Sequence, residues 1–483
     1  MLDRMIERYH KMNVTAKASI WFVFCSLMQK GISTITVPIF TRLMSTEEYG
    51  VYSLYLSWFS ILTIFTSLNL YYGVFNNVMN RERDSRIRDR YVSSMQGLVV
   101  TLTGVLALIY FPFQHFWSSV LGLSQLAIWL MLLELLVEPA VQFWLARQRF
   151  EFKYKHAVAI TMLKSILNPL LGLVLVLLAH GDRAIARIIS VVIAEFLVAG
   201  TIMIIQFAKG RIYYSKEYWK YALEFNIPLL PHYLSAVILN QADRVMIETL
   251  VNVSKVGIYS VAYNIGMLIQ LFTNSINNSL TPWTYEKLNQ KNYKAIRKTT
   301  NLLLLYLALA IVCILLFVPE LVRIFASKEY YEAIYVVPPV ACSVFFIFLY
   351  NIFAIPQMYF ERQKFMSVAS IIAAILNVLL NYIFIRSFGY IAAGYTTVVC
   401  YLLYSIGHFI FCKKVCKEKI GHMELYDSKA IVLISALVLL TSILFNFLYL
   451  LTFVRYILFA VIIVIGIYKK KHIMEVFTNL KNK

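Results

Sequence analysis

Charged residues are scarce in this chain and make up only 14% of its 483 residues. A soluble domain of ordinary composition carries about 25% charged residues. The chain is instead 60% hydrophobic, with a mean hydropathy of +0.69. This composition excludes an ordinary soluble domain and predicts a membrane protein that crosses the bilayer many times.

Cysteines are few, and the familiar catalytic motifs are missing. Six cysteines are scattered singly, and Cys412 and Cys416 have no matching His or Cys pair to complete a zinc site. We therefore expect reduced thiols and no bound metal. There is no Gly-Lys dipeptide, so the phosphate loop of ATPases is absent, and neither H-E-x-x-H nor G-x-S-x-G occurs. These absences exclude ATP hydrolysis by that loop and the two corresponding hydrolase classes.

Long hydrophobic runs fill the sequence, and each is close to the roughly 20 residues that a helix needs to cross a bilayer. We predict an all-α polytopic membrane protein with about 14 transmembrane helices. The first run is too long for a signal-peptide core, so we expect a retained helix. The candidate spans are 18–43, 51–76, 91–113, 123–145, 158–179, 186–208, 222–247, 257–281, 301–318, 335–360, 366–385, 390–412, 430–450 and 454–468.

Positive charge is concentrated in alternate loops, although the net charge of the chain is +20. The basic segments are the N-terminal residues with Arg4, Arg8, Lys11 and Lys17, and then 81–90, 147–155, 209–220, 287–298, 362–364, 413–429 and 469–483. The intervening loops contain Arg183, Arg187, Lys255, Arg323, Lys328, Arg386 and Arg455. Because basic loops stay in the cytoplasm, both termini should be cytoplasmic. Topology thus explains the charge without a nucleic-acid partner.

The sequence repeats itself at a spacing of 207 residues. The stretch STEEYGVYSLYL (45–56) matches NVSKVGIYSVAY (252–263), and Pro112 matches Pro319 at the same spacing. After a small slip, RQRF (147–150) matches RQKF (362–365). We predict a six-helix lobe at 1–208, a second six-helix lobe at 209–412, and two added helices with a basic cytoplasmic tail at 413–483.

The repeat also predicts local structure and topology. Ser45 and Glu48 have the spacing of a capping box, and Asn252 is a favourable N-cap, so a helix should begin at each place. Six spans per repeat make the repeats parallel. Transporters built from such repeats often bind substrate between them, near the middle of the membrane.

A few charged residues interrupt the spans, where each costs from a few to more than ten kcal/mol. Lys30 lies near the centre of the first span beside Gln29, and faces either a water-filled cavity or a structural partner. Asp243 and Arg244 are neighbours on a helix and so do not face each other. Both residues are candidates for a role in a cavity or a gate.

Other charged residues in the spans have two interpretations each. Arg42 and Lys164 serve either a substrate cavity or anchoring near a membrane surface. Glu134 and Glu138 share one helix face, and Glu195 lies near the middle of the sixth span. These three are candidates for a proton or cation site, or counter-ions for Lys30.

Two segments carry a family resemblance. VPIFTRLMSTEEYGVYSLY (37–55) and LNQADRVMIETLVNVSKVGIYSVAY (239–263) resemble Wzx-type polysaccharide-transport flippases of the multidrug/oligosaccharidyl-lipid/polysaccharide exporter superfamily. In that branch a Pro-x-x-Thr-Arg run precedes Glu-Tyr-Gly, and an Asp-Arg pair precedes Gly-x-Tyr-Ser. The likeness covers nearly the whole chain, although the stretch at 388–404 departs from the family's Gly-x-x-Gly-Ala-Ala pattern. The matching residues are Pro38, Thr41, Arg42, Glu48, Tyr49, Gly50, Asp243, Arg244, Gly257, Tyr259 and Ser260.

The resemblance implies a transporter with two MATE-like lobes in the bacterial inner membrane. Its members flip undecaprenyl-diphosphate-linked oligosaccharides for O-antigen, capsule or exopolysaccharide through a cationic cavity. They use no cofactor, and a proton or sodium gradient is thought to drive them. The polymerase and glycosyltransferases of the same pathway are candidate partners. The candidate cavity residues are Lys30, Arg42, Arg244, Gln29, Asn240, Gln241 and Lys164. Lys30 is a candidate because of its position in the span and not because of a family motif. The candidates for ion coupling or a gate are Asp243, Glu134, Glu138 and Glu195.

Three other functions remain open. An ion-coupled multidrug exporter of the same superfamily should have mainly buried acidic residues, whereas the charges here are mixed. A lipid II flippase differs only in its glycan. A membrane polysaccharide polymerase or ligase usually carries a sizeable outer loop, and the longest one here, roughly 319–334, is short.

Overall fold

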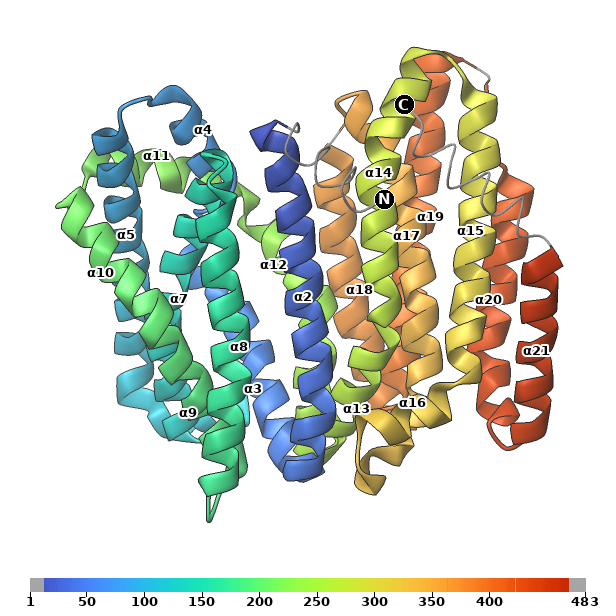
Figure 1. Cartoon of the computed structure of the whole chain (residues 1–483), viewed down its shortest axis with the longest axis horizontal. Coiled ribbons are helices and arrows are strands. Elements are labelled where there is room, and N and C mark those ends of the chain that lie inside the picture. Colours follow the sequence, from blue (N-terminus) through green and yellow to red (C-terminus); the bar gives the residue numbers. More distant parts are fainter. Residues whose placement is uncertain (1–12, 363, 422, 469–483) are drawn as a thin grey trace, which may run out of the picture. The chain divides into compact units, whose positions relative to one another are not determined.

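The computed structural model describes residues 13–362, 364–421 and 423–468. These residues form helices and helical turns and no strand (Figure 1). Thirteen of the described helices are long and apolar enough to cross a membrane, and a shorter apolar helix covers Thr452–Val464. The predicted all-α fold with about 14 membrane helices is confirmed. The basic residues Arg4, Arg8 and Lys11 and the tail at 469–483 lie outside the described residues.

The chain divides into two compact units, Met1–Val237 (unit 1) and Ile238–Lys483 (unit 2). The division falls within α12 (Leu230–Leu250). The lobe boundaries after residues 208 and 412 follow the sequence repeat and remain predictions.

The helices of unit 1 precede α12 in the sequence. They are α2 (Val14–Leu43), α3 (Thr46–Ser67), α4 (Gly73–Arg81), α5 (Ser85–Tyr110), η1 (Phe111–Phe113), α6 (Gln114–Leu121), α7 (Gln125–Phe150), α8 (Tyr154–Leu178), α9 (Arg183–Glu195), the π-helical η2 (Phe196–Gly200), α10 (Thr201–Gly210), α11 (Lys216–Asn226) and η3 (Ile227–Leu229).

The remaining helices belong to unit 2. They are α13 (Val253–Gly266), α14 (Leu268–Asn289), α15 (Tyr293–Leu316), α16 (Val318–Phe325), η4 (Lys328–Tyr335), α17 (Val337–Tyr359), α18 (Lys364–Phe388), α19 (Ala392–Ile420), α20 (Ser428–Leu448) and α21 (Thr452–Tyr468).

Both predicted helix starts are present. Before α3, the Ser45 hydroxyl accepts a hydrogen bond from the Glu48 N–H at 3.2 Å, and the Ser45 N–H donates to the Glu48 carboxylate at 2.8 Å. Before α13, the Asn252 side chain accepts from the Lys255 N–H at 3.0 Å. A cap of this kind stabilises a helix by about 1 kcal/mol. The two repeats therefore begin corresponding helices with the same kind of contact.

Helix packing within each unit places the polar residues discussed below. In unit 1, α8 packs against α2 and α9, and α7 packs against α3 and α9. In unit 2, α17 packs against α13, α19 and α20, and α18 packs against α19. Polar side chains on these helices are thus held close to side chains that are distant in the sequence.

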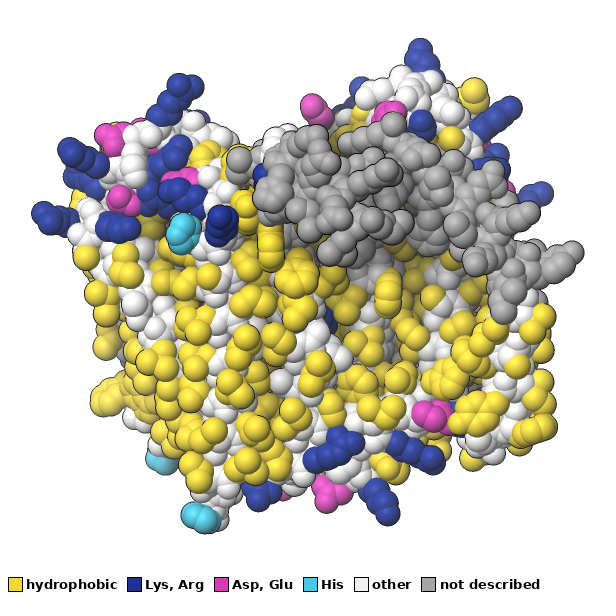
Figure 2. Space-filling model, viewed as in Figure 1, with side chains coloured by type: hydrophobic (Ala, Val, Ile, Leu, Met, Phe, Trp, Pro, Cys, Tyr) yellow, Lys and Arg dark blue, Asp and Glu magenta, His cyan; other side chains and the backbone are white. Residues whose placement is uncertain are grey.

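The outer surface of each unit suits a lipid environment. In the view of Figure 2, hydrophobic side chains cover the helix walls, while Lys and Arg side chains gather toward the helix ends. Every backbone polar group in a bilayer must be satisfied internally, which helices achieve. The chain is therefore a multi-pass membrane protein.

The assignment of Arg187 and Arg455 to loops is wrong. Arg187 lies within α9 and is 5% exposed, and Arg455 lies within α21 and is 2% exposed. Both arginines lie inside the expected spans 186–208 and 454–468, close to where each begins, and each guanidinium is buried with hydrogen-bond partners. Arg187 donates to Asn168 and Ser190, and Arg455 donates to Glu320.

Candidate functional site

Lys30 is a partly buried cation near the middle of α2. Among the described residues, no carboxylate oxygen lies within 4.0 Å of its ammonium nitrogen. Arg42, at the end of the same helix, is exposed, and its guanidinium donates to the Pro38 carbonyl at 2.7 Å. Lys30 therefore places a positive charge in the first span without a described carboxylate within 4.0 Å.

Three carboxylates and one lysine form a buried cluster in unit 1. The Lys164 ammonium lies 2.7 Å from a Glu195 carboxylate oxygen. Glu134 accepts from the Tyr55 hydroxyl at 2.6 Å, and Glu138 accepts from the Gln142 amide at 2.6 Å. Both glutamates are close enough to Lys164 for their charges to interact with it. One ammonium cannot neutralise three ionised carboxylates, so this cluster can hold a proton or another cation.

A polar cavity of about 380 Å³ adjoins this cluster in unit 1. Gln29 of α2, Lys164 of α8 and the α7 residues Gln142 and Arg149 help to line it. The cavity brings together two predicted residues, Gln29 and Lys164. The cavity thus places Lys164 and Arg149 beside the buried carboxylate cluster.

Asp243 is the centre of a buried network in unit 2. Its carboxylate accepts hydrogen bonds from Tyr259 at 2.6 Å, from Thr397 at 2.9 Å and from the Asn381 amide at 2.6 Å. The Asn381 amide also donates to Asn377 at 3.3 Å. Carboxylate, amide and hydroxyl oxygens are ligands that hard cations prefer. A small monovalent cation or a proton could therefore be held at Asp243.

Arg244 is buried beside this network but has different partners. Its guanidinium donates to Ser260 at 3.2 Å, to the Asn240 carbonyl at 2.9 Å and to Gln241 at 3.3 Å. Its Cζ atom lies 4.4 Å from the centre of the Tyr263 ring. No carboxylate of the described chain is within 4.0 Å of the guanidinium. The adjacent Asp243 and Arg244 thus do not form an ion pair.

Several partners of these charged residues were not predicted from the sequence. They are Tyr55, which donates to Glu134, and Tyr259, Asn381 and Thr397, which donate to Asp243. Asn377 and Asn381 are four residues apart on α18, and such spacing places two amides on one helix face. That spacing is a signal already present in the sequence.

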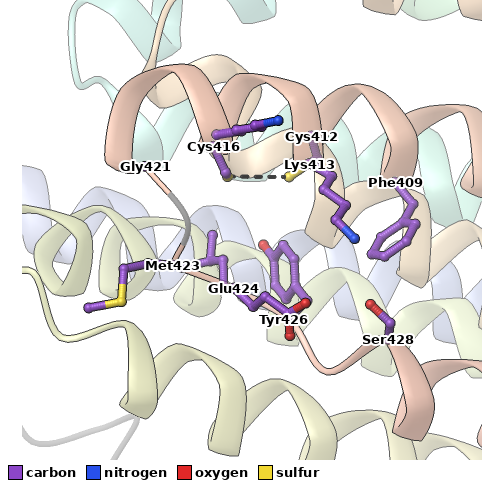
Figure 3. Close-up of a pocket in the computed structure, with 11 residues that line it drawn as sticks. Phe409, Cys412, Lys413, Cys416, Gly421, Met423, Glu424, Tyr426 and Ser428 are labelled. Atoms are coloured by element: carbon purple, nitrogen blue, oxygen red, sulfur yellow. Dashed lines mark hydrogen bonds between the residues drawn. The ribbon is translucent and has the colours of Figure 1, made fainter.

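A separate cavity of about 250 Å³ lies in unit 2 where α19 ends and α20 begins (Figure 3). Cys412 and Cys416 point toward each other from α19, with their sulfur atoms 3.9 Å apart. All six cysteines are free thiols, as expected. None of the predicted site residues lines this cavity.

Comparison with known families places the chain among membrane transporters. The model of the family described as "Polysaccharide biosynthesis protein" matches residues 15–287, and the MatE model matches residues 228–383. A probable low-salt glycan biosynthesis flippase, Agl15 of Haloferax volcanii, is 21% identical over 426 residues, covering 85% of this chain and 86% of that protein. A protein of the Lsg locus of Haemophilus influenzae is 20% identical over 383 residues, covering 75% and 89%.

Two solved structures have a similar fold. The lipid II flippase MurJ in an inward closed conformation has a TM-score of 0.69 at 13% identity, covering 94% of this chain and 100% of that one. An inward-facing multidrug resistance MATE family transporter has a TM-score of 0.65 at 15% identity, covering 82% and 96%. At these identities the likeness concerns the fold.

Proposed function

Since the chain belongs to the polysaccharide biosynthesis protein family, within the multidrug/oligosaccharidyl-lipid/polysaccharide exporter superfamily, we propose that it flips a polyprenyl-diphosphate-linked oligosaccharide. The movement runs from the inner to the outer leaflet of the bacterial inner membrane by alternating access. One observation carries the proposal. Lys30 and Arg244 lie within membrane spans, and neither is paired with a described carboxylate.

Unpaired cations suit a diphosphate headgroup. A positive charge interacts more strongly with an anion in a low-dielectric environment than in water. A guanidinium can also donate two parallel hydrogen bonds to a phosphate, and an ammonium attracts it as a point charge. Lys30 and Arg244 therefore supply the diphosphate contacts, with Arg42, Gln29, Asn240, Gln241 and Lys164 as further contacts. The relatives named as flippases of a glycan pathway and of lipid II support this substrate class.

The coupling ion binds at Asp243 in this proposal. Its network offers a carboxylate among amide and hydroxyl groups, which suits a sodium ion or a proton. Glu134, Glu138 and Glu195 form a second candidate site, for a proton, because Lys164 cannot neutralise all three. No ATP is consumed in this mechanism, and the ion gradient is the energy source.

Replacement of Lys30 tests the proposed function. In a host strain that lacks the chromosomal gene, Lys30→Ala should abolish export of the surface glycan at unchanged protein abundance. Lys30→Arg should retain part of the export, because it keeps the charge. Ser33→Ala is the control on the same helix, since the exposed Ser33 hydroxyl bonds only to the Lys30 carbonyl. Full export by Lys30→Ala would remove Lys30 from the site, and normal surface glycan in the deletion strain would refute the function.

A multidrug exporter is the second candidate function. The buried carboxylates of unit 1 and the match to the MatE model favour it. An exporter of cationic drugs would move a fluorescent cationic dye out of cells, with loss of efflux in Glu134→Gln. A flippase would leave dye accumulation unchanged.

A further inference from the structure

Arg187 is a buried cation of unit 1 with only neutral partners among the described residues. Its guanidinium donates to Asn168 Oδ1 and to Ser190 Oγ, each at 2.7 Å. The Cζ atom lies 4.4 Å from the ring centre of Phe40 and 4.9 Å from that of Tyr52. No described carboxylate oxygen is within 4.0 Å. Neutral oxygens and aromatic faces thus hold the charge, as they do in sites built for an organic cation.

The surroundings of Arg187 correspond through the repeat to the surroundings of Asp243. ILNPLLG (166–172) aligns with ILNVLLN (375–381), and SVV (190–192) aligns with TVV (397–399). Asn168 therefore corresponds to Asn377, and Ser190 corresponds to Thr397. Tyr52 and Tyr259 have the spacing of 207 residues found elsewhere. In unit 1, Asn168, Ser190 and Tyr52 contact a guanidinium. In unit 2, Tyr259 and Thr397 donate to a carboxylate, and Asn377 accepts from Asn381, which also donates to that carboxylate.

Two substitutions between the repeats make room for the guanidinium. Asn381, which donates to Asp243 in unit 2, corresponds to Gly172 in unit 1. A Cβ atom at Gly172 would lie only 2.8 Å from Arg187 Nη1 and 2.8 Å from the Phe40 ring. Asp243 itself corresponds at the 207-residue spacing to Thr36, which carries no charge. Unit 1 has therefore lost the carboxylate and the amide, and its arginine fills the space beside the glycine.

We propose that Arg187 is a tethered cation of unit 1. It permanently fills the position that corresponds, in unit 2, to the place where Asp243 binds an exchangeable cation. These two repeat-related positions then provide one exchangeable site per chain and not two. The role of Asp243 rests on the proposed function, whereas the role of Arg187 does not. Arg187 is a positioning residue: its guanidinium ties Phe40 of α2 and Tyr52 of α3 to Asn168 of α8.

Chemical rescue with guanidinium tests the assignment. The purified full-length Arg187→Ala protein should have a lower Tm than the unsubstituted protein. Guanidinium chloride at low millimolar concentration should restore the Tm saturably, whereas sodium chloride at equal ionic strength should not. Arg183→Ala is the matched control, because Arg183 is an exposed arginine one turn earlier on α9. Absence of rescue, or the same response in Arg183→Ala, would overturn the proposal.

A second pair of variants serves if Arg187→Ala does not fold. Gly172→Asn should lower the Tm of the otherwise unchanged protein, because the new side chain collides with the guanidinium. The Gly172→Asn/Arg187→Ala protein copies the arrangement of unit 2. Its loss of Tm should be much smaller than the sum of the losses in the two single variants. Additive losses, or a Gly172→Asn protein as stable as the unsubstituted one, would contradict the proposal.

Cation titration of transport separates this inference from the proposed function. The part of the cation dependence of transport that Asp243→Asn removes should follow a Hill coefficient close to one. A second cation-binding step would contradict the one-site claim if it survives in Asp243→Asn and disappears when Thr36 is replaced by Val. The guanidinium experiment needs no substrate, so a failed flipping assay refutes the proposed function and leaves the role of Arg187 standing.

Discussion

At the scale of single residues, the cations within the spans differ in how they are neutralised. Lys164 pairs with Glu195 at 2.7 Å, whereas Lys30, Arg187 and Arg244 have no carboxylate within 4.0 Å in the part of the chain that the structure describes. Arg187 and Arg244 are both buried among neutral partners, whereas Lys30 is only partly buried.

Asp243 provides a test of ion coupling at this scale. Asp243→Asn keeps the size of the side chain but removes the charge that Tyr259, Thr397 and Asn381 stabilise. A hydrogen bond to a charged group is worth about 1.5–3 kcal/mol. Stimulation of transport by an imposed sodium or proton gradient should therefore fall by about tenfold or more, measured in proteoliposomes.

The control for this variant is Glu248→Gln, a carboxylate on the same helix that accepts from Thr249. It should keep the response to the gradient. If the response of transport to the gradient is unchanged in Asp243→Asn, the coupling site is not at Asp243.

Single residues were predictable where a charge stands out against an apolar background. Lys30, Asp243 and Arg244 could be found in this way, because burying a charge is costly and needs a reason. Arg187 could not, since it lies only one turn into α9, at the edge of the expected span 186–208. Its burial depends on Phe40, Tyr52 and Asn168, which packing brings together from distant parts of the sequence.

At the scale of helices, the start and end of each span follow from local signals. The capping box at Ser45 and the cap at Asn252 were predictable because their contacts lie within four residues. The expected span 222–247 lies within the continuous helical span Lys216–Leu250, which tightens to a 3-10 turn at η3 between α11 and α12. Pro228 lies in η3 between them, where a proline removes a helical N–H donor. Hydropathy alone does not register such a change of helix type.

One exposed contact joins three elements of unit 2 and depends on pH. Glu332 of η4 accepts from Lys255 of α13 and from Tyr390, which precedes α19. The hydrogen bond from Lys255, and then that from Tyr390, hold the pKa of Glu332 below its ordinary value of 4.5. A carboxyl group with a lowered pKa stabilises the fold above its unfolded pKa, and this stabilisation is lost as the pH falls through the folded pKa.

Glu332→Gln should therefore reduce stability near pH 7 by about 0.2–1 kcal/mol, the range for exposed ion pairs. The difference from the unsubstituted protein should shrink below about pH 4.5, measured as the Tm of the detergent-solubilised protein. Glu329→Gln, an exposed glutamate on the same helical turn, should show no such pH dependence. A difference that stays constant from pH 7 to pH 4 would show that the Glu332 charge is not involved.

At the scale of the whole molecule, the sequence repeat relates the two units. It accounts for their shared sequence pattern, and it shows at which corresponding positions their side chains differ. The same spacing of 207 residues relates helix starts, prolines and tyrosines. The repeat and the all-α architecture were predictable because both are written as local patterns along the chain. The chemistry at corresponding positions has diverged, to Arg187 in unit 1 and to Asp243 in unit 2, and only the packed helices reveal this.

Flipping by the purified protein tests the central claim most directly. The substrate is a fluorescent polyprenyl-diphosphate oligosaccharide in proteoliposomes, and its transfer is read by a membrane-impermeant quencher. An uncharged polyprenyl glycoside is the matched control. We predict transfer of the diphosphate lipid but not of the control. Lys30→Ala should reduce the rate of transfer about tenfold or more, because it removes one contact to a charged group. Equal transfer of both lipids, or an undiminished rate in Lys30→Ala, would contradict a cationic path for the headgroup.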